Sequence, residues 1–144
     1  MNVRWFLLLQ ALLLAASVNV AAEDMSADQA LEAAREQRVM LVDVRTPAEW
    51  KQTGIAPGAA RISVTEHPQG ERGFVADVLA LVDGDRSRPV AVICRTGRRS
   101  AAAERLLERN GFSHVYNVVE GMAGSSAGPG WLARGLPTEP CPTC

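Results

Sequence analysis

Two apolar runs constrain the fold more than any other feature of this sequence. Residues 39–44 read VMLVDV and residues 90–93 read VAVI. Neither run alternates apolar with polar positions, as a strand with one face in water would do. Such runs are typical of strands that are covered on both faces, which is the situation in a parallel sheet. The sequence therefore predicts that both runs are strands of a parallel sheet.

Helical patterns lie on either side of these runs. Ser26 precedes Gln29 and Thr46 precedes Glu49 by three residues in each case, which is the capping-box pattern of a helix start. Apolar residues recur at helical spacing over residues 74–82. The sequence thus predicts two helices that start after Ser26 and Thr46, and a third helix over residues 74–82.

A fourth helix is predicted over residues 100–110. Its alanines and leucines fall on one face, whereas Glu104 and its charged neighbours are expected on the outer face. Further strands are expected at residues 60–64 and 115–119. Strands separated by helices predict the fold class α/β, an open, mainly parallel sheet with helices on both faces.

The first residues have the composition of a secretory signal peptide. Arg4 precedes an apolar stretch over residues 5–18, and small residues follow before an acidic pair. The stretch is shorter than the roughly 20 residues of a membrane-spanning helix, although an uncleaved anchor or a buried helix is the alternative. We expect a signal peptide at residues 1–22, one domain at 23–137 and a tail at 138–144. The mature chain would be periplasmic or otherwise exported, with no stable membrane insertion.

Charge and cysteine content narrow the functional classes. Lys and Arg number 15 against 16 Asp and Glu, a formal net charge of -1, which gives no broad attraction to nucleic acid or to an anionic membrane. We therefore expect no nucleic-acid partner. The three cysteines are too few for a disulfide-built scaffold, and their odd number leaves at least one unpaired within the chain.

The chemistry concentrates after the second apolar run. Cys94 directly follows this run, and an arginine-rich loop connects it to the next helix. Ligands in open α/β sheets bind beyond the carboxyl ends of strands, where N–H groups at a helix start would face the thiol. These donors and the arginines should stabilise a thiolate and attract an anionic substrate, whereas the alternative is a small buried cysteine beside a solvated turn. The candidate substrate-binding residues are Arg95, Thr96, Gly97, Arg98, Arg99 and Ser100.

This loop resembles the active-site loop of rhodanese-type sulfurtransferases. Three further segments are similar to motifs of that family in the same order, namely residues 41–50, 54–59 and 111–117. The resemblance covers roughly residues 26–123. Together with the signal segment, the chain is similar to the single-domain periplasmic rhodaneses of bacteria.

The resemblance implies a sulfurtransferase with Cys94 as its catalytic nucleophile. Sulfane sulfur from thiosulfate or a similar small anionic donor would form a persulfide on Cys94, and cyanide or a thiol would then accept it. No metal or organic cofactor is expected, because the leaving group of the sulfur donor carries the reaction. Arg95 and Arg98 are expected to reach the substrate, and Arg99 to close the loop or share the anion.

Other polar residues near the motifs receive structural roles or none. Asp43 and Arg45, at the end of the first apolar run, are expected to provide structural support through hydrogen bonds that join loops. Glu49 is interpreted as a helix-capping residue. His67 and His114 are isolated in the sequence, and neither is assigned a role.

The sequence departs from the family pattern at three places. Ile55 stands where the family commonly has histidine. Glu120 replaces the first glycine of a pair, and its charge is expected to alter the rim of the pocket. Ser125 occupies a tryptophan position, and Trp131 follows later, as in an extended loop over residues 124–131. These departures leave the choice of substrate open.

The chain ends in the sequence CPTC, which begins at Cys141 and ends at Cys144. This spacing matches redox dithiols, but a simple disulfide explains it as well. A possible redox pair would receive sulfur from Cys94 or resolve its persulfide. A structural zinc site needs four ligands, so two cysteines would require help from elsewhere, and no metal is assigned.

Three rival functions stand beside sulfur transfer. Cysteine-dependent phosphatases resemble this loop, but they place five residues between cysteine and arginine, against four between Cys94 and Arg99. A noncatalytic anion-binding or interaction domain would keep the fold without the chemistry. A thiol-redox protein that uses the tail cysteines is the third alternative.

Overall fold

The computed structural model describes residues 23–144, so the predicted signal peptide lies outside the described residues. This part of the chain contains no helix long and apolar enough to cross a membrane. Its elements, in chain order, are β1 (Glu23–Met25), α1 (Ala27–Arg35), β2 (Met40–Asp43), α2 (Pro47–Thr53), β3 (Ala60–Arg61), α3 (Gly70–Leu81), β4 (Val90–Ile93), α4 (Arg98–Arg109) and β5 (Val115–Val118).

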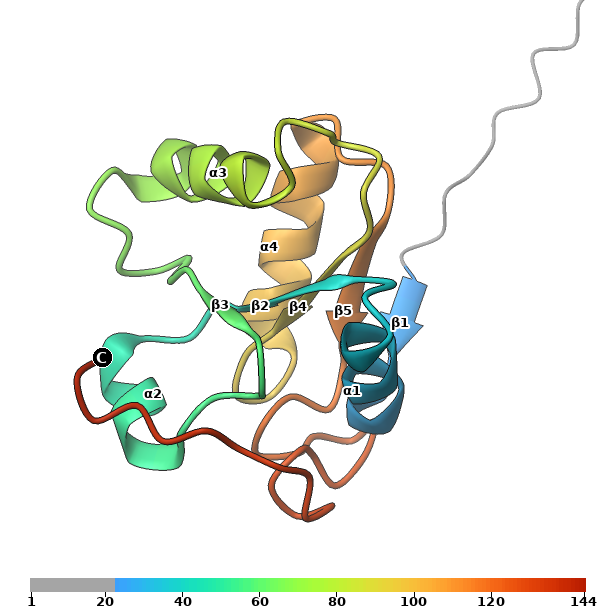
Figure 1. Cartoon of the computed structure of the whole chain (residues 1–144), viewed down its shortest axis with the longest axis vertical. Helices are drawn as coiled ribbons and strands as arrows, with labels where there is room; N and C mark the ends of the chain where they lie inside the picture. Colours follow the sequence, from blue (N-terminus) through green and yellow to red (C-terminus); the bar gives the residue numbers. More distant parts are fainter. Residues whose placement is uncertain (1–22) are drawn as a thin grey trace, which may run out of the picture.

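The strands form one sheet in the order β1-β5-β4-β2-β3, and every neighbouring pair is parallel (Figure 1). β4 lies at the centre, where Val92 pairs with Val42 of β2 on one side and with Asn117 of β5 on the other. The two apolar runs of the sequence are therefore neighbouring strands. Their pairing confirms the predicted α/β fold with a parallel sheet.

Successive residues of the central strands supply two separate cores, because alternate side chains point to opposite faces of a sheet. Leu41 and Ile93 belong to the core that contains the apolar residues of α1. Val42 and Val92 belong to the core with α3 and α4. Figure 1 shows α1 and α4 on opposite faces of the sheet. Both faces of the sheet are covered by packed side chains, which explains why the two runs do not alternate apolar with polar residues.

The predicted helix starts are confirmed. The Ser26 hydroxyl accepts a hydrogen bond from the backbone N–H of Gln29, and Thr46 accepts one from Glu49 in the same way. Each Gln29 or Glu49 side chain accepts from the N–H of its cap residue, which completes both capping boxes. Gly54, with φ +75°, ends α2.

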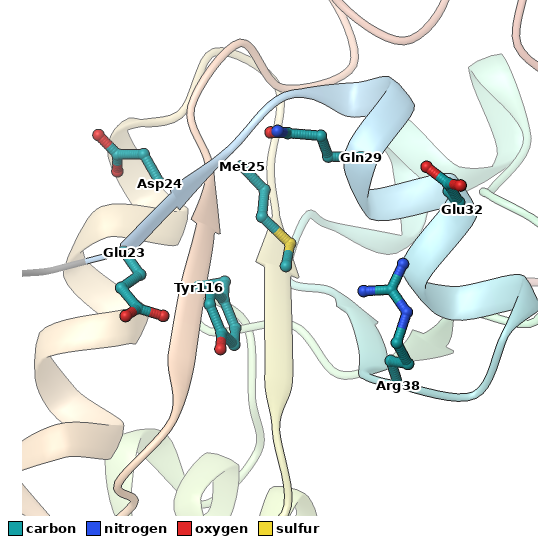
Figure 2. A pocket seen from close by; sticks show the side chains of 7 residues that line it. All are labelled: Glu23, Asp24, Met25, Gln29, Glu32, Arg38 and Tyr116. Carbon is teal, nitrogen blue, oxygen red and sulfur yellow. The ribbon is translucent and has the colours of Figure 1, made fainter.

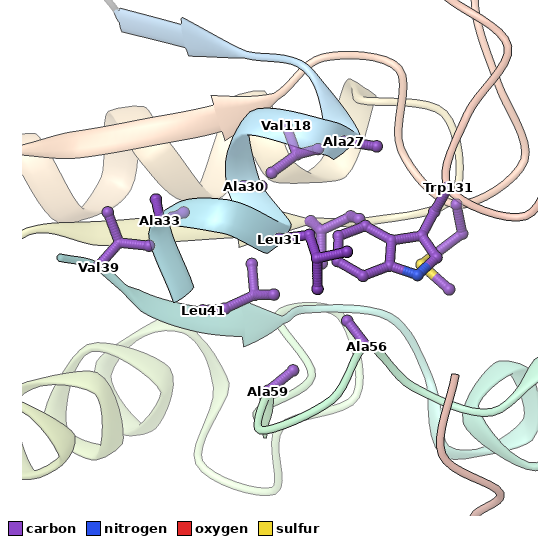
Figure 3. Close-up of a cluster of buried hydrophobic side chains, with 13 residues drawn as sticks. Ala27, Ala30, Leu31, Ala33, Val39, Leu41, Ala56, Ala59, Val118 and Trp131 are labelled. Carbon is purple, nitrogen blue, oxygen red and sulfur yellow. The ribbon is translucent and has the colours of Figure 1, made fainter. Parts of the chain in front are cut away.

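The segment after Gly124 is irregular and lies against the domain. Trp131 is fully buried beside Leu31 in the core on the α1 side (Figure 3). Its Nε1 donates to the carbonyl of Pro137 at 2.9 Å. Further along, Glu139 forms an antiparallel bridge with Ile55. These contacts fix the tail across the sheet edge as far as Glu139.

Element boundaries differ most from the sequence prediction at three places. β1 was not expected, because it is short and acidic, and it exists only through pairs such as Asp24 with Asn117 of β5. α3 begins at Gly70, ahead of the apolar positions that start at Phe74. β3 is confined to Ala60–Arg61. Edge strands depend on their neighbours rather than on their own composition, which is why β1 and β3 are poorly predicted.

Candidate active site

Cys94 follows the central strand β4 and is 1% exposed. The backbone N–H of Gly97 and the hydroxyl of Ser100 both donate to its Sγ, at 3.2 Å each. Ser100 lies in the first turn of α4, so the sulfur faces the N-terminal end of that helix. These donors and the positive end of the helix dipole make this position favourable for negative charge.

Two glycines allow the Cys94 loop to adopt its shape. Gly97 has φ +88°, and a Cβ added there would lie 2.3 Å from the carbonyl oxygen of Val119. A Cβ on Gly121 would lie 2.5 Å from the carbonyl oxygen of Arg95. The N–H of Met122 also donates to the Cys94 carbonyl at 2.9 Å. The segment after β5 therefore packs backbone to backbone against the loop and fixes its course.

The three arginines of the loop differ in their surroundings. Arg99 forms two hydrogen bonds of 2.7 Å with the carboxylate of Glu49 on α2. This bond from Arg99 holds the pKa of Glu49 at about 2, against the opposing effect of its partial burial. Arg95 and Arg98 are exposed, and within residues 23–144 neither side chain has an ion-pair partner. Arg99 thus closes the loop onto α2, while Arg95 and Arg98 are available to an anion.

Asp43 and Arg45 form a buried ion pair that ties β2 to α2. The two Arg45 nitrogens Nε and Nη2 bind the Asp43 carboxylate at 2.7–3.0 Å. Arg45 also donates to the Thr53 hydroxyl and to the Gly54 carbonyl at the end of α2. Both residues are buried away from solvent. Their geometry is that of the structural support expected from the sequence.

Asn117 and Glu104 are two buried polar residues that were not identified from the sequence. Asn117 donates from Nδ2 to the Gly97 carbonyl at 3.3 Å, so β5 also supports the loop. The prediction that Glu104 lies on the outer face of its helix is wrong, since it is only 2% exposed. Its Oε1 has no hydrogen-bond partner among the described residues. Burial, with help from the nearby charges of Glu108 and Asp24, raises the pKa of Glu104 to about 7.

Glu120 does not form the rim of a pocket, contrary to the expectation from the sequence. It is buried, and its carboxylate accepts hydrogen bonds from the N–H groups of Ala27 and Gly130 and from Arg134. Burial acts to raise its pKa, but these hydrogen bonds outweigh it and lower the pKa. Glu120 therefore joins α1 to the loop that carries Trp131.

A hollow of about 550 Å³ lies away from the Cys94 loop, beside β1 and the start of α1 (Figure 2). Its lining is mostly polar and acidic, and no residue from 94 to 100 contributes to it: the lining residues are Glu23, Asp24, Met25, Gln29, Glu32, Arg38 and Tyr116. Across residues 23–144, His, Cys, Asp and Glu side chains form no group of three that could hold a metal ion.

The tail cysteines are bonded to each other rather than placed at Cys94. Cys141 and Cys144 form a disulfide, and Cys94 is the free cysteine. Arg61 of β3 donates to both tail sulfurs at 2.8 Å. Nothing in the sequence pattern indicated this contact, because Arg61 and Cys141 are separated by 80 residues along the chain.

The described residues belong to the class of open, parallel α/β proteins, which bind ligands beyond the carboxyl ends of their strands. At that edge, Cys94 follows the central strand and accepts hydrogen bonds from a backbone N–H and a hydroxyl. Comparison with known sequences identifies the family within this class. The chain belongs to the rhodanese-like domain family, whose model matches residues 26–127. The match includes the four segments that resemble family motifs, residues 41–50, 54–59, 94–100 and 111–117.

Several relatives share a large part of this chain. It is 31% identical over 99 residues to a protein named sulfurtransferase from Allochromatium vinosum, covering 69% of this chain and 77% of that protein. It is 32% identical over 90 residues to thiosulfate sulfurtransferase GlpE of Pseudomonas syringae, covering 62% and 74%. The crystal structure of Rv0390 from M. tuberculosis superposes with a TM-score of 0.63 at 32% identity, covering 82% and 97%. Family and relatives together support a general role in sulfur transfer.

Proposed function

We propose that this chain is a sulfurtransferase that carries sulfane sulfur as a persulfide on Cys94. The observation that carries the proposal is the pair of donors at its Sγ, the N–H of Gly97 and the hydroxyl of Ser100. These groups can stabilise negative charge on Cys94 both as a thiolate and, after sulfur uptake, as a persulfide. Two relatives named as sulfurtransferases add support.

In the first half-reaction, the Cys94 thiolate attacks the outer sulfur of thiosulfate. A bond forms between Sγ and that sulfur, the sulfur–sulfur bond of thiosulfate breaks, and sulfite leaves with the electron pair. Arg95 and Arg98 supply the positive charge that attracts the dianion to the loop, since neither is neutralised by a carboxylate. Arg99 keeps the loop in place through Glu49 and does not need to touch the donor.

In the second half-reaction, a nucleophilic acceptor removes the terminal sulfur. Cyanide or a thiolate attacks this sulfur, and the Cys94 thiolate is regenerated as the leaving group. The same two donors that hold the resting thiolate stabilise it as it leaves. No change in the fold is required between the two steps.

The experiment is thiosulfate-to-cyanide sulfur transfer, measured as thiocyanate with intact mass in parallel. We expect turnover and an adduct of about 32 Da, one sulfur atom, on the reduced protein. Cys94→Ser should abolish both. Ser100→Ala should keep the adduct but slow turnover by about tenfold to 100-fold, as expected for the loss of one hydrogen bond to a charged group. Binding of thiosulfate with no adduct would instead indicate a noncatalytic anion-binding domain.

We also propose that the chain is exported. The signal-like composition of residues 1–22 and a tail disulfide, which persists best in an oxidising compartment, both support export. Fractionation of cells should recover the protein outside the cytoplasm, with a mature mass that corresponds to cleavage before Glu23. Recovery of the full-length chain in the cytoplasm would contradict this proposal.

A further inference from the structure

The tail disulfide lies under a positive charge. Nη1 of Arg61 is 2.8 Å from the Sγ of both Cys141 and Cys144. Arg61 is exposed at the end of the edge strand β3, and it forms no ion pair with any described carboxylate. The two sulfurs are therefore the groups that this guanidinium faces.

A charge in this place favours the reduced form of the pair. A disulfide carries no charge, whereas reduction creates thiols that ionise, and a guanidinium beside them stabilises the thiolate. Stabilising the reduced state makes a disulfide easier to reduce. The tail is already fastened by Trp131 and by the bridge between Glu139 and Ile55. A cross-link between residues three positions apart adds little to that fastening, because it closes a very short loop.

We propose that Cys141 and Cys144 form a redox-active dithiol site, and that the reduced pair is the acceptor of the sulfane sulfur on Cys94. This proposal rests on the proposed function of Cys94. It assigns to the chain the second substrate of its own reaction, a dithiol, rather than leaving that substrate to a separate small molecule.

The placement of the pair in the fold favours this role. Asp43 pairs with Ile93 on one side and with Arg61 on the other, so Arg61 stands two strand spacings, about 10 Å, from the residue before Cys94. The tail runs past the carboxyl ends of the strands and finishes beside α2 (Figure 1). The last five residues after Glu139 span up to about 17 Å when extended. Release from Arg61 thus gives the chain end access to the edge of the sheet where Cys94 lies.

Sulfur transfer from Cys94 to the tail dithiol needs no further catalytic group beside Cys94. Cys144 is the more exposed of the pair, since Cys141 is only 8% exposed. In the reduced pair, the Cys144 thiolate attacks the terminal sulfur of the Cys94 persulfide. Cys94 leaves as a thiolate, and a persulfide forms on Cys144. The Cys141 thiolate then attacks the Cys144 sulfur, which forms the disulfide and releases hydrosulfide. The transferred sulfur is reduced by two electrons, the dithiol is oxidised by two, and an external dithiol reductant resets the pair.

The redox part is tested by equilibrating the whole chain in dithiothreitol buffers and measuring the tail thiols by alkylation and mass. Arg61→Gln should make the pair about threefold to tenfold harder to reduce, and Arg61→Lys should restore most of the difference. Arg38→Gln, which removes another exposed arginine, is the matched control and should have no effect. Equal reduction of the native chain and Arg61→Gln would overturn the redox assignment.

The acceptor part is tested in a single turnover with fully reduced protein, one equivalent of thiosulfate and no added thiol. The native chain should release one sulfite and one hydrosulfide per chain and re-form the tail disulfide. Cys141→Ser/Cys144→Ser should release sulfite but stop at the Cys94 persulfide. Hydrosulfide release by this double variant, or a lasting persulfide in the native chain with both tail thiols free, overturns the acceptor role.

Failure of the proposed function gives a different result. In that case neither the native chain nor the Cys141→Ser/Cys144→Ser variant would form a Cys94 persulfide, whether the donor is thiosulfate or inorganic polysulfide. That outcome removes the acceptor role of the tail as well. The dithiothreitol equilibration of the native chain and Arg61→Gln still decides whether the tail is a redox site.

Discussion

Cys94 and the tail pair both lie near the carboxyl edge of the sheet, but different parts of the chain build their surroundings. The Cys94 sulfur is buried and held by a backbone N–H and a hydroxyl within six residues of it. The tail sulfurs lie at the chain end and meet one exposed side chain from β3. A sulfur atom can thus be contacted by fixed local dipoles or by a single exposed charge. The first kind of site depends on loop geometry, and the second on one arginine.

The largest effect should come from breaking the geometry of the Cys94 loop. Gly97→Ala places a Cβ at 2.3 Å from the Val119 carbonyl, so the loop must shift, and transfer should fall by at least about 100-fold. Gly84→Ala is the matched control, because Gly84 also has a positive φ but open space around it. Thiocyanate assays and urea unfolding compare the two. Similar losses of activity in both variants would contradict the role of geometry.

A smaller effect should come from the exposed charges of the same loop. Arg95→Gln and Arg98→Gln should each raise the KM for thiosulfate by about tenfold with less change in kcat, because they attract the dianion rather than hold the sulfur. The increase should shrink at high ionic strength. Arg109→Gln, at the far end of α4, serves as the control. An unchanged KM in both loop variants would show that local dipoles alone bind the donor.

Glu104 tests whether a buried carboxyl on α4 destabilises the fold once it ionises. Its pKa of about 7 lies above the ordinary value of 4.5, so its contribution to stability is fully present below pH 4.5 and is lost as the pH rises through 7. Glu104→Gln removes this loss and should stabilise the fold by about 1–3 kcal/mol at pH 8. Urea unfolding at pH 4 should show no gain. A gain of equal size at both pH values would contradict the titration.

The smallest effect is expected for Glu49, which joins the loop to α2. Its pKa of about 2 means that its contribution is present above the ordinary value of 4.5 and is lost as the pH falls towards 2. The ion pair with Arg99 is partly exposed, so Glu49→Gln should cost about 1 kcal/mol or less at pH 7. Thermal unfolding at several pH values should show the variant and native chains converging in acid. A constant difference would assign the effect to the lost helix cap instead.

Features encoded by neighbouring residues could be predicted from the sequence, and those made by distant segments could not. The strand at residues 90–93, the capping boxes and the donors at Cys94 each depend on a few adjacent residues. The burial of Glu104 depends on how α4 packs on β5, and the burial of Glu120 on contacts 93 residues away. The contact between Arg61 and the tail spans 80 residues. In each case that was not predicted, segments distant in the sequence set the surroundings of a polar residue.

The dependence of the Cys94 loop on the segment after β5 has a consequence for the folding of the chain. Residues 117–122 must dock before the loop is complete, so during folding Cys94 is for a time an unprotected thiol. Closing the short ring between Cys141 and Cys144 costs much less chain entropy than closing the long one to Cys94. Mispairing is therefore disfavoured kinetically, and Cys94 stays free when the chain folds under oxidising conditions.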